Sequence, residues 1–187
     1  MLESAGMIEA VGRGAFVVAR NGNPLNQSLA LLVSAKDGDV RELFEVRKIL
    51  EAETAALAAE RRTEDDVARM KAALEEMRVG IGSRERYTAG DIQFHLAVVA
   101  ASQNRMASHM MQAIRSVMRR TLASIYEIPG SPQRSSEQHA QILDAVVGGR
   151  GDEARDRMRE HLLTVERAIE ETLRRPPADR RWEGADG

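Results

Sequence analysis

Four side chains that bind metals well are spaced along this chain so that helices could bring them together. Asp91 and His95 are four residues apart, which places them one above the other on one face of a helix. His139 and His161 each lie in a segment whose apolar residues recur at helical spacing. If the three helices pack side by side, one carboxylate and three imidazoles converge, which suits a divalent metal of the zinc, nickel or manganese type.

The surroundings of the histidines favour one shared site over three unrelated side chains. A single helical histidine is more often a surface residue or a hydrogen-bonded core residue than a metal ligand. Here His95, His139 and His161 all adjoin apolar stripes, and burying three imidazoles without partners costs free energy. The fourth histidine, His109, has Arg105 rather than a carboxylate one turn before it, so we expect it at the surface or in an interface.

Three nitrogens and one oxygen would leave one or two coordination positions open on such a metal. Open positions suit either catalysis or recognition of a chelating carboxylate, and the residues alone do not choose between them. Glu137 and Glu160 are candidates for a catalytic base only by proximity in sequence, and solvated helix-face charges are the commoner use of such residues. The chain contains no His-Glu-x-x-His, no Glu-x-x-His pair and no P-loop glycine motif.

The composition indicates a soluble, helical protein of about one domain. The 187 residues are only 3% aromatic, which favours helices over a β-sandwich. The absence of cysteine excludes disulfides and thiolate metal sites. A formal net charge of −2 argues against a surface that binds nucleic acid over its whole extent, but it leaves room for a local basic patch. No apolar run approaches membrane-spanning length and no signal-peptide layout occurs, so we expect a cytoplasmic protein without a membrane partner.

The elements that would position the four candidate ligands are helices, preceded by a short hairpin. Two apolar runs surround Gly12-Arg13-Gly14, which predicts two strands and a tight turn. In chain order, the predicted segments are the hairpin (residues 1–20), a linker with a short helix (21–38), a helical domain (39–175) and a disordered tail (176–187). The fold class is therefore all-α, an antiparallel bundle of six to seven helices after the hairpin.

Capping and turn residues divide the helical domain. Thr63 followed by Asp66 predicts one capping box, and Ser135 followed by Gln138 predicts another after a loop at 129–132. The helix that carries the Asp91/His95 pair should span about residues 87–101, and Asp152 should cap the last helix. The apolar residues expected to face the core are Leu43, Val46, Leu50 and Leu57; Val67, Met70, Leu74 and Met77; Met106, Met110, Ile114, Val117, Met118 and Leu122; Ile142, Leu143 and Val146; and Met158, Leu162, Val165 and Ile169.

These residues resemble the C-terminal ligand-binding (FCD) domain of GntR transcription regulators of the FadR subfamily. The stretch Leu43–Glu51, followed by Ala55–Ala59, is similar to the opening helix of that domain. The candidate ligands, together with Asn104, match its metal motif in order and spacing, and the resemblance covers residues 25–173. The metal ligands that the resemblance implies are Asp91, His95, His139 and His161.

The resemblance also implies a function for the domain and roles for further residues. A bound metal would help to hold a small organic acid, and that binding would alter the affinity for operator DNA. Arg47 and Asn104 would contact the effector, since a guanidinium binds carboxylates through two parallel hydrogen bonds. An intrahelical pair with Glu51, four residues on, is an equally weighted alternative for Arg47.

The N-terminal hairpin is similar to the wing of that family's winged helix-turn-helix. Leu2–Glu9 resembles the end of the recognition helix, and Arg13 at the hairpin tip would contact a DNA phosphate or the minor groove. The two earlier helices and most of the recognition helix would then precede Met1, so we expect an incomplete DNA-binding head in this chain. A fragment, a start placed too late or a natural truncation would each explain this.

Three functions follow as hypotheses. The first, a ligand-responsive transcription regulator that is not an enzyme and forms a homodimer, is favoured by the four-ligand pattern together with the wing-like start. The second is a metalloenzyme that acts on a small carboxylate substrate at the open coordination positions, and it lacks a convincing base. The third is a dimerisation module with a structural metal.

Overall fold

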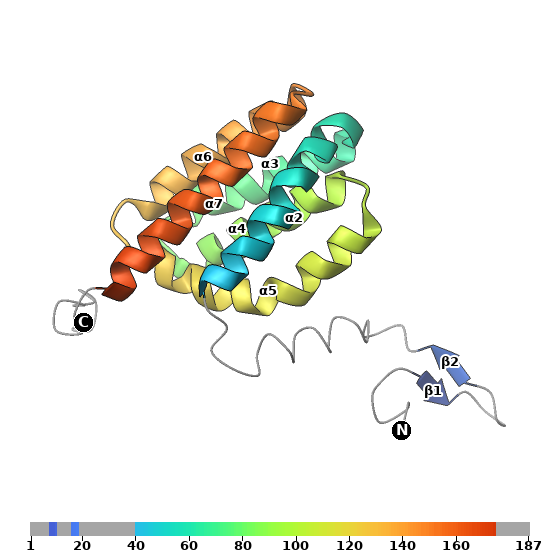
Figure 1. Ribbon diagram of the computed structural model, residues 1–187, viewed down its shortest axis with the longest axis horizontal. Coiled ribbons are helices and arrows are strands. Elements are labelled where there is room, and N and C mark those ends of the chain that lie inside the picture. Colours follow the sequence, from blue (N-terminus) through green and yellow to red (C-terminus); the bar gives the residue numbers. More distant parts are fainter. Residues whose placement is uncertain (1–7, 11–15, 19–39, 175–187) are drawn as a thin grey trace.

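The computed structural model describes residues 8–10, 16–18 and 40–174, and it is helical from residue 40 onward. The helices are α2 (Val40–Arg61), α3 (Glu64–Val79), α4 (Arg84–Ala101), α5 (Arg105–Tyr126), α6 (Ser131–Val147) and α7 (Gly151–Arg174). They pack together as one bundle (Figure 1), which confirms the all-α prediction. Within residues 40–174, no helix combines the length and the apolar character needed to cross a membrane.

Two short strands come before the helices. β1 (Ile8–Ala10) and β2 (Phe16–Val18) pair antiparallel, with Ile8 opposite Val18. The turn that contains Arg13, the linker at 21–38 and the tail at 176–187 lie outside the described residues. The wing and the boundaries of these segments therefore stay predictions.

Helix α2 contacts four other helices of the bundle. It packs mainly against α7 and α4 and also contacts α6 and α5, while α3 packs against α4 and α6. Figure 1 shows α2 and α6 on either side of α7. Because α2 touches four other helices, side chains on its inner face reach the middle of the bundle, and this is where the candidate ligands from α4, α6 and α7 also point.

The core is built from aliphatic side chains and methionines, but two of the predicted stripes are wrong in part. On α5, Met106 is 61% exposed and Met110 is 41% exposed, whereas Met111 is fully buried. On α2, Val46 is 42% exposed, because the inner face continues from Phe44 at three- and four-residue steps. Both helices carry apolar residues at adjacent positions, so their sequence allows two rotations of the apolar face.

Side chains fix the starts of two helices. The capping box at α3 is confirmed: the Thr63 hydroxyl accepts from the Asp66 amide at 3.2 Å, and the Asp66 carboxylate accepts from the Thr63 amide at 3.0 Å. Helix α4 begins at Arg84, earlier than predicted, because Ser83 accepts a hydrogen bond from the Arg86 amide and caps the helix.

The predicted capping box at Ser135 and Gln138 is wrong. Helix α6 begins at Ser131, after Gly130 in the left-handed conformation at φ 73°, so the end of the expected loop is already helical. Pro132 fits the first turn, where a backbone N–H would have no intrahelical acceptor. Ser135 consequently lies inside the helix and is buried. The prediction that Asp152 caps the last helix is also wrong, because α7 begins at Gly151 and Asp152 lies in its first turn.

Gly90 allows α3 and α4 to approach closely at the level of the candidate site. A β-carbon there would lie 2.8 Å from the Met77 backbone nitrogen and 3.1 Å from the Ala73 backbone oxygen. We expect Gly90→Ala to lower the free energy of unfolding by about 1–3 kcal/mol, since overpacking against backbone outweighs the better helix propensity of alanine. Urea denaturation measures this. Gly82→Ala is the matched control, because a β-carbon there meets no atom within 4 Å. Equal stabilities of the two variants would contradict the close approach.

Candidate metal centre

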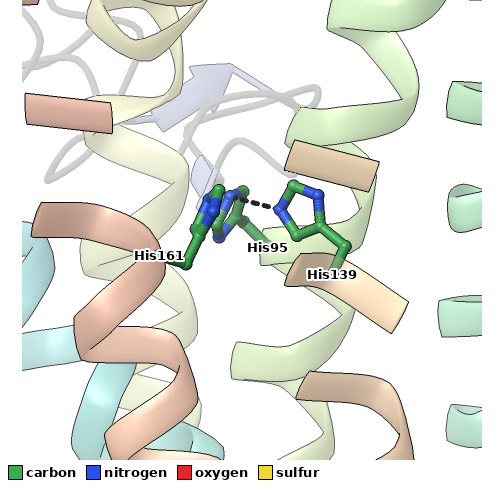
Figure 2. A group of neighbouring side chains, drawn as sticks. All are labelled: His95, His139 and His161. Carbon is green, nitrogen blue, oxygen red and sulfur yellow. Dashed lines mark hydrogen bonds between the residues drawn. The ribbon is translucent and has the colours of Figure 1, made fainter. Parts of the chain in front are cut away.

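Three histidines from three helices meet in the middle of the bundle. Figure 2 shows the imidazoles of His95 on α4, His139 on α6 and His161 on α7 facing one another. Each offers a ring nitrogen, and these nitrogens all lie within 4.8 Å of one another. His95 and His139 are fully buried and His161 is 1% exposed. The structure thus brings together the three histidines that the sequence singled out.

Asp91 lies beside two of these histidines. Its carboxylate oxygens lie 3.7 Å from His95 Nε2 and 3.8 Å from His139 Nε2, and these two nitrogens are 3.1 Å apart. Around a metal with bonds of about 2.0–2.2 Å, neighbouring ligand atoms are separated by roughly 3–3.5 Å. The 3.1 Å between His95 and His139 falls in this range and the two distances from Asp91 are slightly longer, so Asp91 would need a small movement to share a metal with these two histidines.

Neighbouring side chains fix which ring nitrogens are available. His161 Nδ1 lies 3.0 Å from the Gln138 side-chain oxygen, and Gln138 in turn donates to the Thr164 hydroxyl at 3.3 Å. An acceptor at Nδ1 holds the proton there and leaves the lone pair on Nε2. His95 is oriented in the same sense, because its Nδ1 lies 2.5 Å from a Glu51 carboxylate oxygen. Contacts of this kind typically orient metal-binding histidines.

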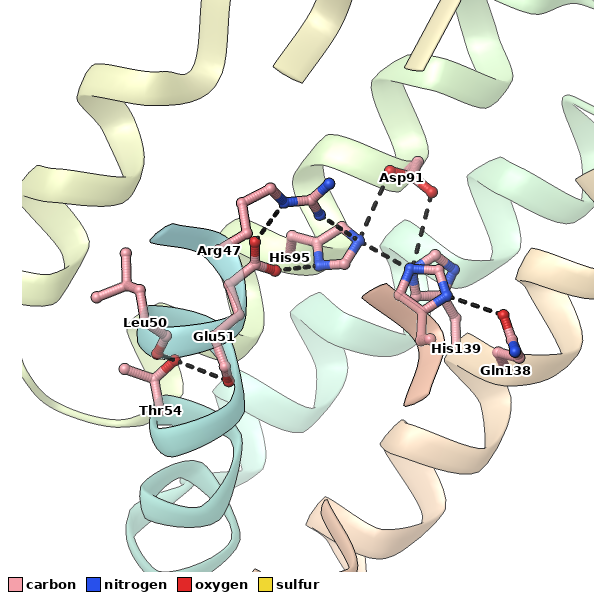
Figure 3. Close-up of polar contacts among 9 residues, drawn as sticks. Arg47, Leu50, Glu51, Thr54, Asp91, His95, Gln138 and His139 are labelled. Carbon is pink, nitrogen blue, oxygen red and sulfur yellow. Dashed lines mark hydrogen bonds and ion pairs between the residues drawn. The ribbon is translucent and has the colours of Figure 1, made fainter. Parts of the chain in front are cut away.

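A buried ion pair on α2 borders the group. Arg47 Nε lies 2.6 Å from Glu51 Oε1, and Arg47 Nη2 lies 3.2 Å from His95 Nε2 (Figure 3). Arg47 and Glu51 are both 0% exposed, and the guanidinium carbon of Arg47 is 5.1 Å from the centre of the Phe44 ring. The pair with Glu51, one of the two alternatives for Arg47, is therefore present. It stands at the candidate site and not on the helix surface.

Burial and charge set the protonation of the site. Burial lowers the pKa of His139 and of His161 well below the ordinary value, and nearby His95 and Arg47 lower both further. These lowered pKa values favour the neutral, metal-binding form of His139 and His161. Burial raises the pKa of Asp91, although His95 and Arg47 act against this. Burial also favours a higher pKa for Glu51, but Arg47 and His95 outweigh it and hold this pKa at about 2.

Several buried polar atoms at this place have no hydrogen-bond partner among the described residues. They include Arg47 Nη1, Asp91 Oδ2 and His139 Nδ1. Leaving a buried polar atom unpaired costs about 1–3 kcal/mol, so such atoms are rare in folded proteins and seldom gather in one place. Three imidazoles, one carboxylate and these unpaired atoms suit a divalent cation together with a polar ligand.

Other residues considered from the sequence lie elsewhere. Asn104 is exposed and caps α5, where its side-chain oxygen accepts from the Ala107 amide at 3.2 Å. Glu137 and Glu160 are exposed, so neither is placed to act as a base at the histidines. The sequence interpretation treated Glu51 only as a possible partner of Arg47. A stronger signal for it was available, because residues 44, 47, 51, 55 and 58 form one helix face and charged residues occupy its middle.

Comparison with known proteins identifies the class. The FCD domain family matches residues 42–164. The chain is 37% identical over 171 residues to the HTH-type transcriptional regulator LutR of Bacillus subtilis (strain 168), across 88% of this chain and 78% of LutR. It is 33% identical over 148 residues to the galactonate operon transcriptional repressor of Escherichia coli (strain K12), across 76% of this chain and 64% of the repressor.

The fold agrees with this comparison. The solved structure of Streptococcus agalactiae GntR superposes with a TM-score of 0.69 at 20% identity, across 89% of this chain and 77% of that one. The chain therefore belongs to the FCD-domain family. It is a transcription regulator of the GntR type, as predicted, and its relatives are regulators and not enzymes.

Proposed function

We propose that this chain senses a small organic acid with the help of a bound divalent metal. Asp91, His95, His139 and His161 would hold the cation. The observation that carries the proposal is the convergence of three buried imidazoles and a buried carboxylate from three helices beside the buried Arg47. When bound, the metal would supply a Lewis-acidic position for a carboxylate or hydroxyl oxygen of the effector.

The chemistry of the chain's own residues supports an acid as the effector. Arg47 has one guanidinium nitrogen, Nη1, that is buried without a partner and can donate to a carboxylate. Galactonate, which appears in the name of one relative, is a hydroxy acid. A hydroxy acid can chelate a cation through its carboxylate and the adjacent hydroxyl. We therefore infer that hydroxy acids are the effector class to test first. Asn104, with its side chain used as a helix cap, is left out of this site.

The output of the sensor would be a change in operator affinity. In this proposal β1 and β2 belong to the wing of a winged helix-turn-helix, Arg13 contacts the DNA backbone or minor groove, and the regulator binds DNA as a homodimer. Residues that complete the DNA-binding head would be needed for specific binding.

The proposal is tested by titrating the purified chain, stripped with a chelator, with zinc, nickel and manganese ions against a chromophoric competitor. Galactonate is then titrated by calorimetry into the metal-loaded and the stripped protein, with its methyl ester as the control that lacks a carboxylate. We expect stoichiometric metal binding, and acid binding only in the loaded protein. Failure to bind any of the three metals would overturn the proposal. Metal binding that raises the melting temperature, with no further effect of galactonate, would favour a structural metal instead.

A further inference from the structure

We propose that Arg47 is an internal cation that competes with the metal for His95, so that metal loading and acid capture are coupled through its movement. This inference rests on the proposed function, since it presupposes a metal at the histidines. It adds a second role for Arg47, in which the guanidinium opposes metal binding until it moves.

The competition follows from the one lone pair of His95. Glu51 Oε2 lies 2.5 Å from His95 Nδ1, and a carboxylate at this distance favours the tautomer with the proton on Nδ1 and the lone pair on Nε2. Arg47 Nη2 lies 3.2 Å from that same Nε2 and can donate a hydrogen bond to it. Nε2 is also the atom that faces Asp91 and His139, at 3.7 Å and 3.1 Å. A metal held by these residues needs the lone pair that the guanidinium uses.

Charge opposes the two cations as well. A guanidinium in a protein is always protonated, and this one is 0% exposed, so water does not screen it. A divalent cation bound to His95 Nε2 would stand close to this full positive charge, with one carboxylate, Glu51, between Arg47 and His95. Metal binding therefore requires the Nη groups to turn away from His95. The bond from Arg47 Nε to Glu51 Oε1 uses different atoms and can persist as a pivot.

The same movement would prepare Arg47 for an acid. Nη1 has no hydrogen-bond partner, and leaving His95 would free Nη2, so the two nitrogens together could form a fork for one carboxylate. A carboxylate held by this fork would in turn keep the guanidinium away from His95. By thermodynamic linkage, the metal and the acid each raise the affinity for the other by the same factor.

The decisive experiment measures zinc affinity of the whole chain by chelator competition, for the natural protein and for Arg47→Gln. We expect the variant to bind zinc more tightly, by roughly tenfold or more, because a competing cation has been removed. Galactonate should raise the zinc affinity of the natural protein by a larger factor than that of Arg47→Gln, because in the variant only the metal, and not the fork, holds the acid. Arg41→Gln is the matched control on the same helix, where Arg41 pairs with Glu170 near the surface, and its zinc affinity should not change.

Two outcomes overturn the inference. Zinc affinity that is unchanged or lower in a folded Arg47→Gln protein would show that Arg47 does not oppose the metal. If Arg47→Gln does not fold, as judged by circular dichroism, Arg47→Lys is used: it keeps a charge beside Glu51 on a side chain that lacks the fork, so galactonate should raise its zinc affinity by a smaller factor than that of the natural protein. An equal factor in the two proteins overturns the inference. A natural protein that binds no zinc would instead overturn the proposed function, and this inference with it.

Discussion

Replacing His139 with alanine should lower the zinc affinity of the chain by more than about a hundredfold, because partners outside the coordination shell alone typically contribute 10–100-fold. His139 is the contribution of α6 to the site, and its Nε2 lies within 4 Å of both His95 and Asp91. Its removal takes away one of four donors and leaves Asp91 with His95 and His161. Competition with a chromophoric chelator at pH 7 measures the change.

The same variant should lose the stabilisation that the metal gives. A metal that binds only the folded state raises the unfolding free energy with the logarithm of the ratio of its concentration to its dissociation constant, so the zinc-dependent rise in melting temperature should be much smaller in His139→Ala. His109→Ala is the matched control, because His109 is outside the cluster of three histidines. Zinc binding that survives in His139→Ala at its natural strength would remove the metal centre as the basis of the proposed sensor.

The sequence was sufficient to find the histidines because the spacing of each ligand could be evaluated on one helix. Asp91 and His95 share a face whatever the tertiary structure, and His139 and His161 stand beside apolar neighbours that must be buried. The convergence of three separate helices is a tertiary property. It was expected because unpartnered buried imidazoles are costly and because these residues resemble the metal motif of a known family, and the structure now brings the three rings together.

The wrong predictions have a common physical origin: the same side chains are compatible with two local structures. Met106 and Met110 could form an apolar face as well as Ala107 and Met111 do, and packing against the neighbouring helices decides which is buried. At α6, Ser135 and Gln138 have the spacing of a capping box. Gly130 starts the helix one turn earlier, however, and frees Gln138 to orient His161.

Glu51 is the residue whose importance the sequence interpretation underestimated, since i,i+4 pairs of Arg and Glu are common on exposed helix faces. Glu53, two residues further along α2, forms a different kind of pair, with Arg155 on α7 near the surface at 3.0 Å. Glu51 instead contacts Arg47 through one oxygen and His95 through the other, and its side chain is 0% exposed. This makes it the residue that holds both a candidate metal ligand and the buried guanidinium in position.

We therefore expect Glu51→Gln to have two large effects that Glu53→Gln lacks. It should lower the free energy of unfolding of the chelator-stripped protein by about 3–5 kcal/mol, because it leaves the Arg47 charge buried without its counter-ion. It should also lower zinc affinity by about 10–100-fold, because His95 loses the carboxylate that holds its proton on Nδ1. Urea denaturation and chelator competition measure the two effects separately. If Glu51→Gln and Glu53→Gln had equal stability and equal zinc affinity, the ion pair between Glu51 and Arg47 would contribute nothing to the fold or to the orientation of His95. If Glu51→Gln loses stability but keeps its zinc affinity, Glu51 only neutralises the charge of Arg47 and does not orient His95 for the metal.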